Sequence, residues 1–217
     1  MATATLTISS KNYSSWSLRG WLLTKFSGLP FTEQMVPTDD AAARAEILLL
    51  APSMLVPCLK HDGIAVWDTM AISEYLNEVC PKAGLLPMDR AQRARCRSIC
   101  GEMHSGFSAL RSALPMNLKN HYPKFKVWSR AQGDIERITT IWNECLAASG
   151  GPFLFGKLCA ADLMYAPVAT RFNTYDVGLD TVSAAYCARI MELPEMQEWI
   201  AAAKLEPDEI DELEAEF

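Results

Sequence analysis

The chain has 217 residues, of which half are hydrophobic and 21% are charged. This composition excludes an intrinsically disordered chain, and the length suits one large domain or two small ones. The formal net charge of −6 argues against a nucleic-acid-binding protein, because such a protein needs clustered Lys and Arg to replace counterions. No stretch approaches the ~20 apolar residues that cross a bilayer, and the first residues do not resemble a signal peptide. We therefore expect a soluble, cytoplasmic protein.

The seven cysteines and three histidines are scattered along the chain, without a CxxC pair or the spacing of a zinc site. An odd number of dispersed cysteines fits reduced thiols in a cytoplasm rather than a disulfide framework. We therefore predict no metal. The locally basic segment 119–126 is short, and we interpret it as a solvated loop rather than a binding patch.

The first eighty residues alternate between strand and helix signals. Short runs with strand character occupy residues 6–8, 31–36, 56–60 and 64–67, and an Asp-Gly turn between the last two predicts a hairpin. Apolar side chains at helical spacing predict one helix from residue 18 to a stop at Gly28 and another capped by Asp68 or Thr69. Between them, a composition rich in Ala, Glu, Arg and Leu predicts a helix over 40–50. The predicted order is βαβ-α-ββα, a mixed sheet with helices on its faces.

Strand signals almost disappear after a linker over residues 81–87, which is rich in Pro, Gly and Lys. Helical composition or periodicity then marks residues 90–114, 128–149, 160–176, 181–191 and 195–204. The segment 207–217 is acidic and is expected to be frayed or partly helical. The sequence thus predicts a mixed α/β domain over residues 1–80 and an all-helical domain over 88–217.

Three short motifs of the first domain suit a ligand site. Ser14-Ser15-Trp16-Ser17 follows the first strand, Val56-Pro57 opens the third, and Asp68-Thr69 opens the last helix of the domain. Each has a purely structural alternative, because hydroxyls and acids cap helices and proline is tolerated at the first residue of a strand. Pro57 also suits a cis bond, and the start of a helix attracts anions.

Taken together, these motifs resemble the N-terminal thioredoxin-like domain of the cytosolic glutathione transferases. The segment 153–163, with Gly156 and Asp162, is similar to a helix-capping segment of the second domain of that family. Ser14 to Arg19 is most similar to the S-S-C-S-x-R run of the zeta class, which includes maleylacetoacetate isomerases, with Trp16 in place of Cys. The resemblance covers nearly the whole chain and implies a homodimer that uses glutathione as co-substrate. The thiols of a redox CxxC motif are missing here, which disfavours disulfide exchange.

The resemblance also implies roles for individual residues. Ser14 would be the catalytic residue, donating its hydroxyl hydrogen to the glutathione sulfur, with Ser15 at the start of the helix beside it. The backbone of Val56, presented by cis Pro57, would pair with the cysteinyl part of glutathione. Asp68 would hold the γ-glutamyl ammonium group, and Thr69 its carboxylate. Ser17 would be a cap or a core hydroxyl rather than a second sulfur donor.

The electrophile is expected between the start of the first helix and the helix over residues 90–114. The candidate pocket residues are Tyr13, Met103, His104, Phe107 and Arg111, although such a stripe is also typical of a core. Arg111 or His104 would favour an acidic electrophile if it faces the cleft. The leading function is a glutathione transferase acting on a small electrophile. A glutathione-dependent isomerase or peroxidase and a non-catalytic binding protein remain alternatives.

Overall fold

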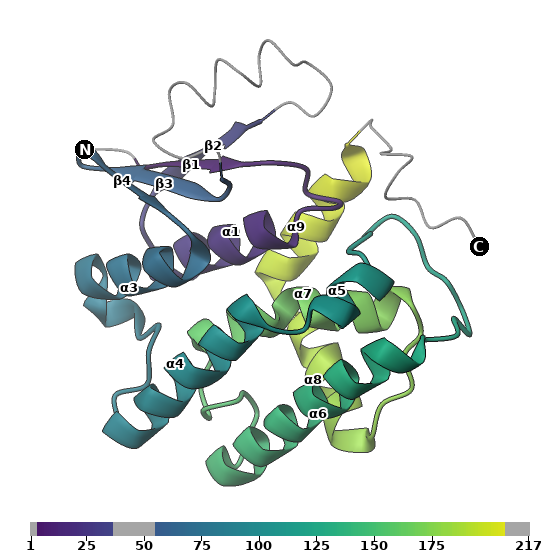
Figure 1. Ribbon diagram of the computed structural model, residues 1–217. Helices are drawn as coiled ribbons and strands as arrows, with labels where there is room; N and C mark the ends of the chain where they lie inside the picture. Colours follow the sequence, from purple (N-terminus) through teal and green to yellow (C-terminus); the bar gives the residue numbers. More distant parts are fainter. Residues whose placement is uncertain (1–3, 37–54, 207–217) are drawn as a thin grey trace.

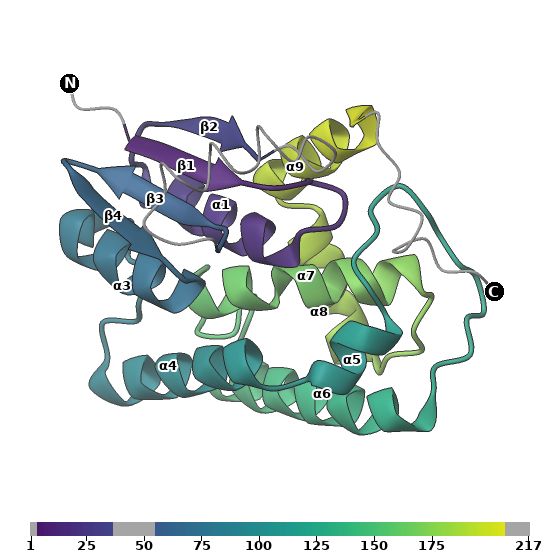
Figure 2. The same ribbon diagram turned by 45° about the horizontal axis from the view of Figure 1, so that its top comes forward.

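A mixed four-stranded sheet forms the N-terminal part of the computed structural model, which describes residues 4–36 and 55–206 (Figure 1). Its strands are β1 (Ala4–Ile8), β2 (Phe31–Met35), β3 (Cys58–His61) and β4 (Ile64–Trp67), in the spatial order β2-β1-β3-β4. β1 and β2 are parallel, and the other pairs are antiparallel. Helices α1 (Ser15–Ser27) and α3 (Thr69–Val79) lie on the same side of this sheet (Figures 1 and 2). The helix expected over 40–50 lies outside the described residues.

The C-terminal part is helical, as predicted. Its helices are α4 (Arg90–Ser105), α5 (Ser108–Ala113), α6 (Ser129–Ser149), α7 (Ala160–Thr174), α8 (Thr181–Met191) and α9 (Pro194–Leu205). The single helix expected over 90–114 is wrong, because the chain breaks after α4. Gly106 is extended and Phe107 adopts a left-handed φ of 56°, so the chain changes direction before α5. The expected linker contains a 3₁₀ turn over Pro81–Ala83.

α7 is the centre of the helical part, because its residues are buried along almost its whole length. Asp162, in its first turn, accepts hydrogen bonds from the backbone N–H groups of Leu154 (3.0 Å) and Cys159 (2.9 Å) and from the Tyr186 hydroxyl (2.9 Å). Burial nevertheless raises the pKa of Asp162 to about 6. This carboxylate joins the segment before α7 to α8, so the capping segment recognised in the sequence organises the core.

None of the described helices is both long and apolar enough to cross a membrane. Within residues 4–36 and 55–206, no cluster of three or more His, Cys, Asp or Glu side chains is arranged to hold a metal ion. The cysteines are free thiols. Cys58, which follows Pro57, is buried, and burial raises the pKa of its thiol. A raised pKa makes this thiol a poor nucleophile, so Cys58 acts as a small core residue.

α1 packs unusually closely on the chain before β3, at Gly20. A Cβ atom at this position would lie 2.5 Å from Cγ and 2.6 Å from Cβ of Pro57. A glycine is otherwise unfavourable inside a helix, so the close approach to the proline ring explains its presence. The contact brings the helix that begins after Ser14 against the segment that contains Val56.

We predict that Gly20→Ala lowers the free energy of unfolding by ~1–3 kcal/mol, because an added methyl group must displace the ring of Pro57. Gly133→Ala is the matched control. It lies exposed in α6 with no atom within 4 Å of the new methyl group, and it should be neutral or stabilise by up to ~1 kcal/mol. Urea unfolding of both variants measures the difference. Equal shifts in the two variants would contradict the tight contact at Gly20.

Candidate functional site

The three motifs leave the sheet at the same edge. The register pairs Thr7 of β1 with Cys58 of β3, and Cys58 with Trp67 of β4, so these residues form one row across three strands. The chain beyond β1 leads to Ser14, the residues just before Cys58 are Val56 and Pro57, and the residues just after Trp67 are Asp68 and Thr69. Because β3 is antiparallel to both neighbours, all three segments leave the sheet on the same side of this row, at one end of the strands.

Ser14 is the N-cap of α1 and is half-buried. Its Oγ accepts a hydrogen bond from the backbone N–H of Ser17 (3.2 Å) and donates to Oγ of Ser17 (2.8 Å). Ser17 has no exposed surface, and its Oγ also accepts from the backbone N–H of Ser9 (3.0 Å). Ser17 is therefore a core hydroxyl, one of the two roles expected for it. The two serines are directly hydrogen-bonded, which the sequence alone did not indicate.

The Val56–Pro57 peptide bond is cis, as expected from the sequence. Val56 is half-buried and Pro57 is buried against α1. The position of Val56, immediately before β3 and beside the end of β1, leaves it next to the segment that carries Ser14.

Asp68 and Thr69 begin α3 in an unusual backbone conformation. Asp68 has φ 75° and ψ 133°, a region that side-chain-bearing residues rarely occupy and that costs ~1–3 kcal/mol. Its Oδ1 accepts from the backbone N–H of Met70 (2.8 Å), which makes it the N-cap. Thr69 is 1% exposed, and its hydroxyl has no hydrogen-bond partner among the described residues. This first turn thus combines strain with an unsatisfied buried hydroxyl, both of which are common at ligand sites.

The second oxygen of Asp68 connects the two parts of the molecule. Oδ2 lies 2.5 Å from Nε2 of His104 in α4, and both side chains are about one third exposed, at 38% and 34%. The ring of His104 in turn contacts Trp16 of α1, with their centroids 5.2 Å apart. His104 therefore reaches the two N-terminal motifs at Asp68 and Trp16.

Of the candidate electrophile residues, His104 and Arg111 come together beside Trp16. The guanidinium of Arg111, which is half-buried in α5, lies 5.6 Å from the ring centroid of Trp16. Met103 is completely buried, so for this residue the structure supports the core alternative. Tyr13 and Phe107 are 9% and 7% exposed and offer little free surface.

Two further arginines lie beneath the start of α1, and the sequence interpretation did not assign them to the site. Arg19 has no exposed surface and donates to the backbone oxygens of Met164 (2.7 Å) and Ser15 (3.2 Å). Its guanidinium also lies 4.7 Å from the ring centroid of Trp16. Arg171 of α7 is 4% exposed and donates to Oγ of Ser15 (3.2 Å). The sequence holds one signal for the role of Arg19: it lies one helical turn after Ser15, on a helix that is expected to be buried.

These buried cations are not neutralised by ion pairs. Within the described residues, none of the salt bridges involves Arg19, Arg111 or Arg171. Burial and the neighbouring Arg111 lower the pKa of Arg171 to about 10, which still leaves it charged at neutral pH. Burial, and after it the charge of Arg171, lowers the pKa of Arg19 well below its ordinary value. The start of α1 therefore has an excess of positive charge, to which the helix dipole adds.

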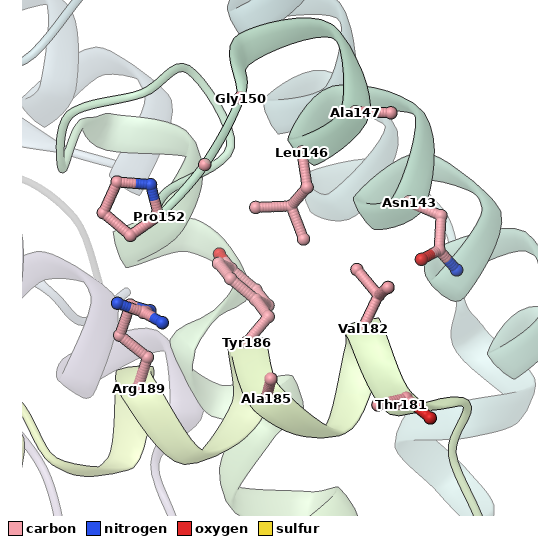
Figure 3. A pocket seen from close by; sticks show the side chains of 11 residues that line it. Asn143, Leu146, Ala147, Gly150, Pro152, Thr181, Val182, Ala185, Tyr186 and Arg189 are labelled. Atoms are coloured by element: carbon pink, nitrogen blue, oxygen red, sulfur yellow. The ribbon is translucent and has the colours of Figure 1, made fainter.

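One hollow in the described surface lies elsewhere. It has a volume of about 670 Å³ and lies between the end of α6 and α8, with Leu146, Pro152, Val182 and Tyr186 around it (Figure 3). None of the sequence-predicted site residues lines it. The candidate site is therefore defined by the convergence of motifs and charges at the sheet edge, not by this hollow.

Comparison with known proteins gives consistent matches in both parts of the chain. The family model described as "Glutathione S-transferase, N-terminal domain" matches residues 13–79, and "Glutathione S-transferase, C-terminal domain" matches residues 120–202. "Probable maleylacetoacetate isomerase 1" of Drosophila melanogaster is 33% identical over 59% of this chain and 51% of its own length. "Maleylacetoacetate isomerase" of Mus musculus is 38% identical over 72% of this chain and 66% of its own.

The chain thus spans about half to two thirds of the length of these curated relatives. A solved structure with a similar fold is a Burkholderia glutathione transferase homologue with bound glutathione. It has a TM-score of 0.70 at 24% identity and covers 94% of this chain and 99% of its own. At this identity, the likeness shows the fold alone.

The excess of positive charge predicts that the site binds small divalent anions. Sulfate should raise the melting temperature of the wild-type chain more than that of Arg111→Met, because ligand binding to the folded state stabilises it and Arg111 is the most accessible of the three cations. Each kcal/mol of stabilisation corresponds to ~2–4 °C. Arg90→Met, an exposed arginine at the start of α4, controls for the general stabilising effect of sulfate. Equal increments in all three proteins would argue against an anion site at Arg111.

Proposed function

Because the chain belongs to the glutathione S-transferase family, we propose that it binds glutathione and stabilises its thiolate for reaction with a small electrophile. The observation that carries this proposal is the meeting of Ser14, Val56-Pro57 and Asp68-Thr69 at one edge of the sheet. Each motif has a structural role by itself. A common ligand gives a reason for their convergence beside arginines that form no ion pair within the described part of the chain.

In the proposed mechanism, Ser14 and the start of α1 stabilise the sulfur anion. Lowering the pKa of a thiol by ~2 units requires ~2.7 kcal/mol of preferential stabilisation of the thiolate. Ser14 turns its hydroxyl hydrogen from Oγ of Ser17 to the sulfur, while its oxygen can still accept from the N–H of Ser17. The helix dipole and the buried Arg19 and Arg171 add a favourable potential. Ser14 is thus a hydrogen-bond donor to the sulfur and not a nucleophile.

The rest of glutathione is assigned to the other two motifs. The backbone of Val56 pairs with the cysteinyl residue as a short added strand. Asp68 takes the γ-glutamyl ammonium group on the oxygen that also contacts His104, since a carboxylate oxygen can accept two hydrogen bonds. The γ-glutamyl carboxylate binds at the start of α3, where Thr69 offers its backbone and, after rotation, its unsatisfied hydroxyl.

A second candidate activity is glutathione-dependent isomerisation of an acidic substrate. Arg111 and His104 lie beside Trp16, where the electrophile is expected, and the surrounding charge is positive. This arrangement favours an electrophile that carries a carboxylate. The relatives named maleylacetoacetate isomerase support the same substrate class.

Calorimetry with glutathione, followed by assays of conjugation, isomerisation and peroxide reduction, tests the proposed function. Binding together with turnover of an acidic unsaturated substrate would favour the isomerase. Binding without turnover in any assay would favour a non-catalytic protein. The proposal of a glutathione enzyme would be withdrawn if glutathione did not bind. The proposed setting is the cytoplasm, with glutathione as co-substrate and no metal.

We predict that Ser14→Ala raises the pKa of the thiol of bound glutathione. It should also lower the rate of the glutathione-dependent reaction ~10²–10³-fold, because one preorganised donor to the developing charge is lost. The same change removes an N-cap and should cost ~1 kcal/mol of stability. Asp89→Ala, which removes the N-cap of α4, controls for this loss and should leave the thiol pKa unchanged.

Ultraviolet titration of the bound thiolate distinguishes these effects. Ser17→Ala keeps the Ser14 hydroxyl and should change the thiol pKa little. A larger shift in Ser17→Ala than in Ser14→Ala would show that the wrong serine has been assigned to the sulfur.

The proposed assembly is a homodimer. Exposed apolar side chains near the outer edge of the sheet give it physical support, since Ile64 and Trp67 of β4 are 51% and 41% exposed. Light scattering of the full chain at micromolar concentration should give about twice the monomer mass. A mass near 24.1 kDa would contradict the dimer.

A further inference from the structure

The negative charge of this protein is concentrated at one end of the sequence. Residues 207–217, here called the acidic tail, hold six of the 26 acidic residues and none of the 20 basic ones. The other 206 residues therefore carry twenty acidic and twenty basic side chains. Ile210, Leu213 and Phe217 recur among the acids at spacings of three and four, so the acidic tail is amphipathic if helical.

The opposite charge is concentrated in another part of the sequence. Residues 103–133 contain five Lys or Arg residues and not one acidic residue. Four of the five lie within residues 119–130, here called the basic segment, which runs from the loop after α5 into the first turn of α6. Opposite charges on two segments attract one another only where the chain can bring them together, so the position of the basic segment is decisive.

The basic segment presents cations and one large aromatic ring to the surface. Lys124, Lys126 and Arg130 are exposed, and none of them takes part in the ion pairs formed within the described residues. Trp128, between them in the sequence, is 72% exposed. Such a large exposed ring is uncommon away from binding surfaces, because tryptophan loses favourable burial there.

The acidic tail starts beside the basic segment. Nζ of Lys119, the first cation of that segment, donates to the backbone oxygen of Glu206, the last residue before the tail. The carboxylate of Glu206 is also held, by the hydroxyl of Ser10 (2.8 Å) and the backbone N–H of Lys11 (2.6 Å). In both views the loop between α5 and α6 rises towards the end of α9 before it descends to α6 (Figures 1 and 2).

We propose that the acidic tail binds the basic segment of the same chain. Its carboxylates neutralise Lys124, Lys126 and Arg130, and its apolar side chains cover Trp128. An extended chain spans ~3.3–3.6 Å per residue, so ten residues beyond Glu206 can reach ~33 Å. The basic segment extends for a similar number of residues from Lys119. Because Glu206 is anchored next to Lys119, the local concentration of the tail is high, which compensates for weak individual ion pairs at the surface.

Zero-length carbodiimide cross-linking of the full chain tests this contact. It joins lysines to carboxylates only where they touch, and mass spectrometry identifies the pairs. We expect links from Lys124 and Lys126 to residues 208–216, and few from the exposed Lys82 and Lys157, which serve as internal references. The links should decrease several-fold at 1 M salt, where the Debye length is ~3 Å. Tail links spread evenly over all exposed lysines would overturn the proposal.

A pair of matched double variants shows whether the acidic tail binds the basic segment specifically or only lies near it. Trp128→Ala/Arg130→Glu leaves both reporter lysines in place and should lower their tail links several-fold. Met88→Ala/Arg90→Glu makes the same kind of change at an exposed apolar residue and arginine elsewhere, and it should leave the links unchanged. The proposal is wrong if the two double variants behave alike.

Other occupants of the basic segment give different results. In a mixture of ¹⁴N- and ¹⁵N-labelled protein, tail links that join light and heavy chains would show that the tail binds a second copy instead. Sedimentation of the protein with phosphatidylserine vesicles, with no tail links in solution, would assign the surface to an anionic membrane. Both results would overturn the intramolecular contact.

Discussion

Two buried arginines hold the start of α1 in place, and each donates a hydrogen bond to the other part of the molecule. Arg19 reaches from α1 to the backbone oxygen of Met164 in α7, and Arg171 reaches from α7 to the hydroxyl of Ser15. Burying a charged group is costly unless polar atoms surround it, so each arginine fixes the position of the oxygens that it needs. The orientation of α1, and with it the position of Ser14, therefore depends on these two hydrogen bonds.

The absence of ion-pair partners for these arginines among the described residues is also chemically useful. A carboxylate beside Arg19 or Arg171 would neutralise the positive potential, whereas the carbonyl and hydroxyl oxygens that accept from these arginines leave their charge in place. An anion at the start of α1 then gains from both the charges and the helix dipole. The same interaction that joins the domains thus prepares the site for a negatively charged sulfur or carboxylate.

Ser14 shows how one side chain can serve folding and the proposed chemistry together. Its oxygen caps α1, while its hydrogen has one acceptor in each state: Oγ of Ser17 in this structure and a ligand sulfur in the proposed complex. Ser17 loses little when that hydrogen turns away, because its Oγ still accepts from the N–H of Ser9. Without a buried acceptor at Ser17, the hydroxyl of Ser14 would be free to rotate. The capping role that competes with the catalytic role in the sequence is therefore compatible with it.

Local signals in the sequence were sufficient for most of the fold, and less so for the site. The Asp-Gly turn and the helix stop at Gly28 act over a few residues, so the hairpin and most helices could be predicted. The break after α4 could not, because it needs Phe107 at a positive φ, which depends on tertiary packing. Arg171 was missed because its partner, Ser15, is 156 residues away in the sequence. The sequence comparison shows only that Trp16 stands in place of a cysteine. Its contacts with Arg19, His104 and Arg111 come from three helices, so they are visible only in the folded chain.

The loop that leads to Ser14 is held from the C-terminal part of the chain. Oδ1 of the fully buried Asn12 accepts from the backbone N–H groups of Leu118 (2.6 Å) and Lys119 (3.1 Å), and the carboxylate of Glu206 accepts from the N–H of Lys11 (2.6 Å). Only Tyr13 separates Asn12 from Ser14, so a displacement of the loop after α5 or of the end of α9 acts directly on the N-cap of α1. The position of the proposed sulfur donor is therefore set jointly by its own helix and by these two distant segments.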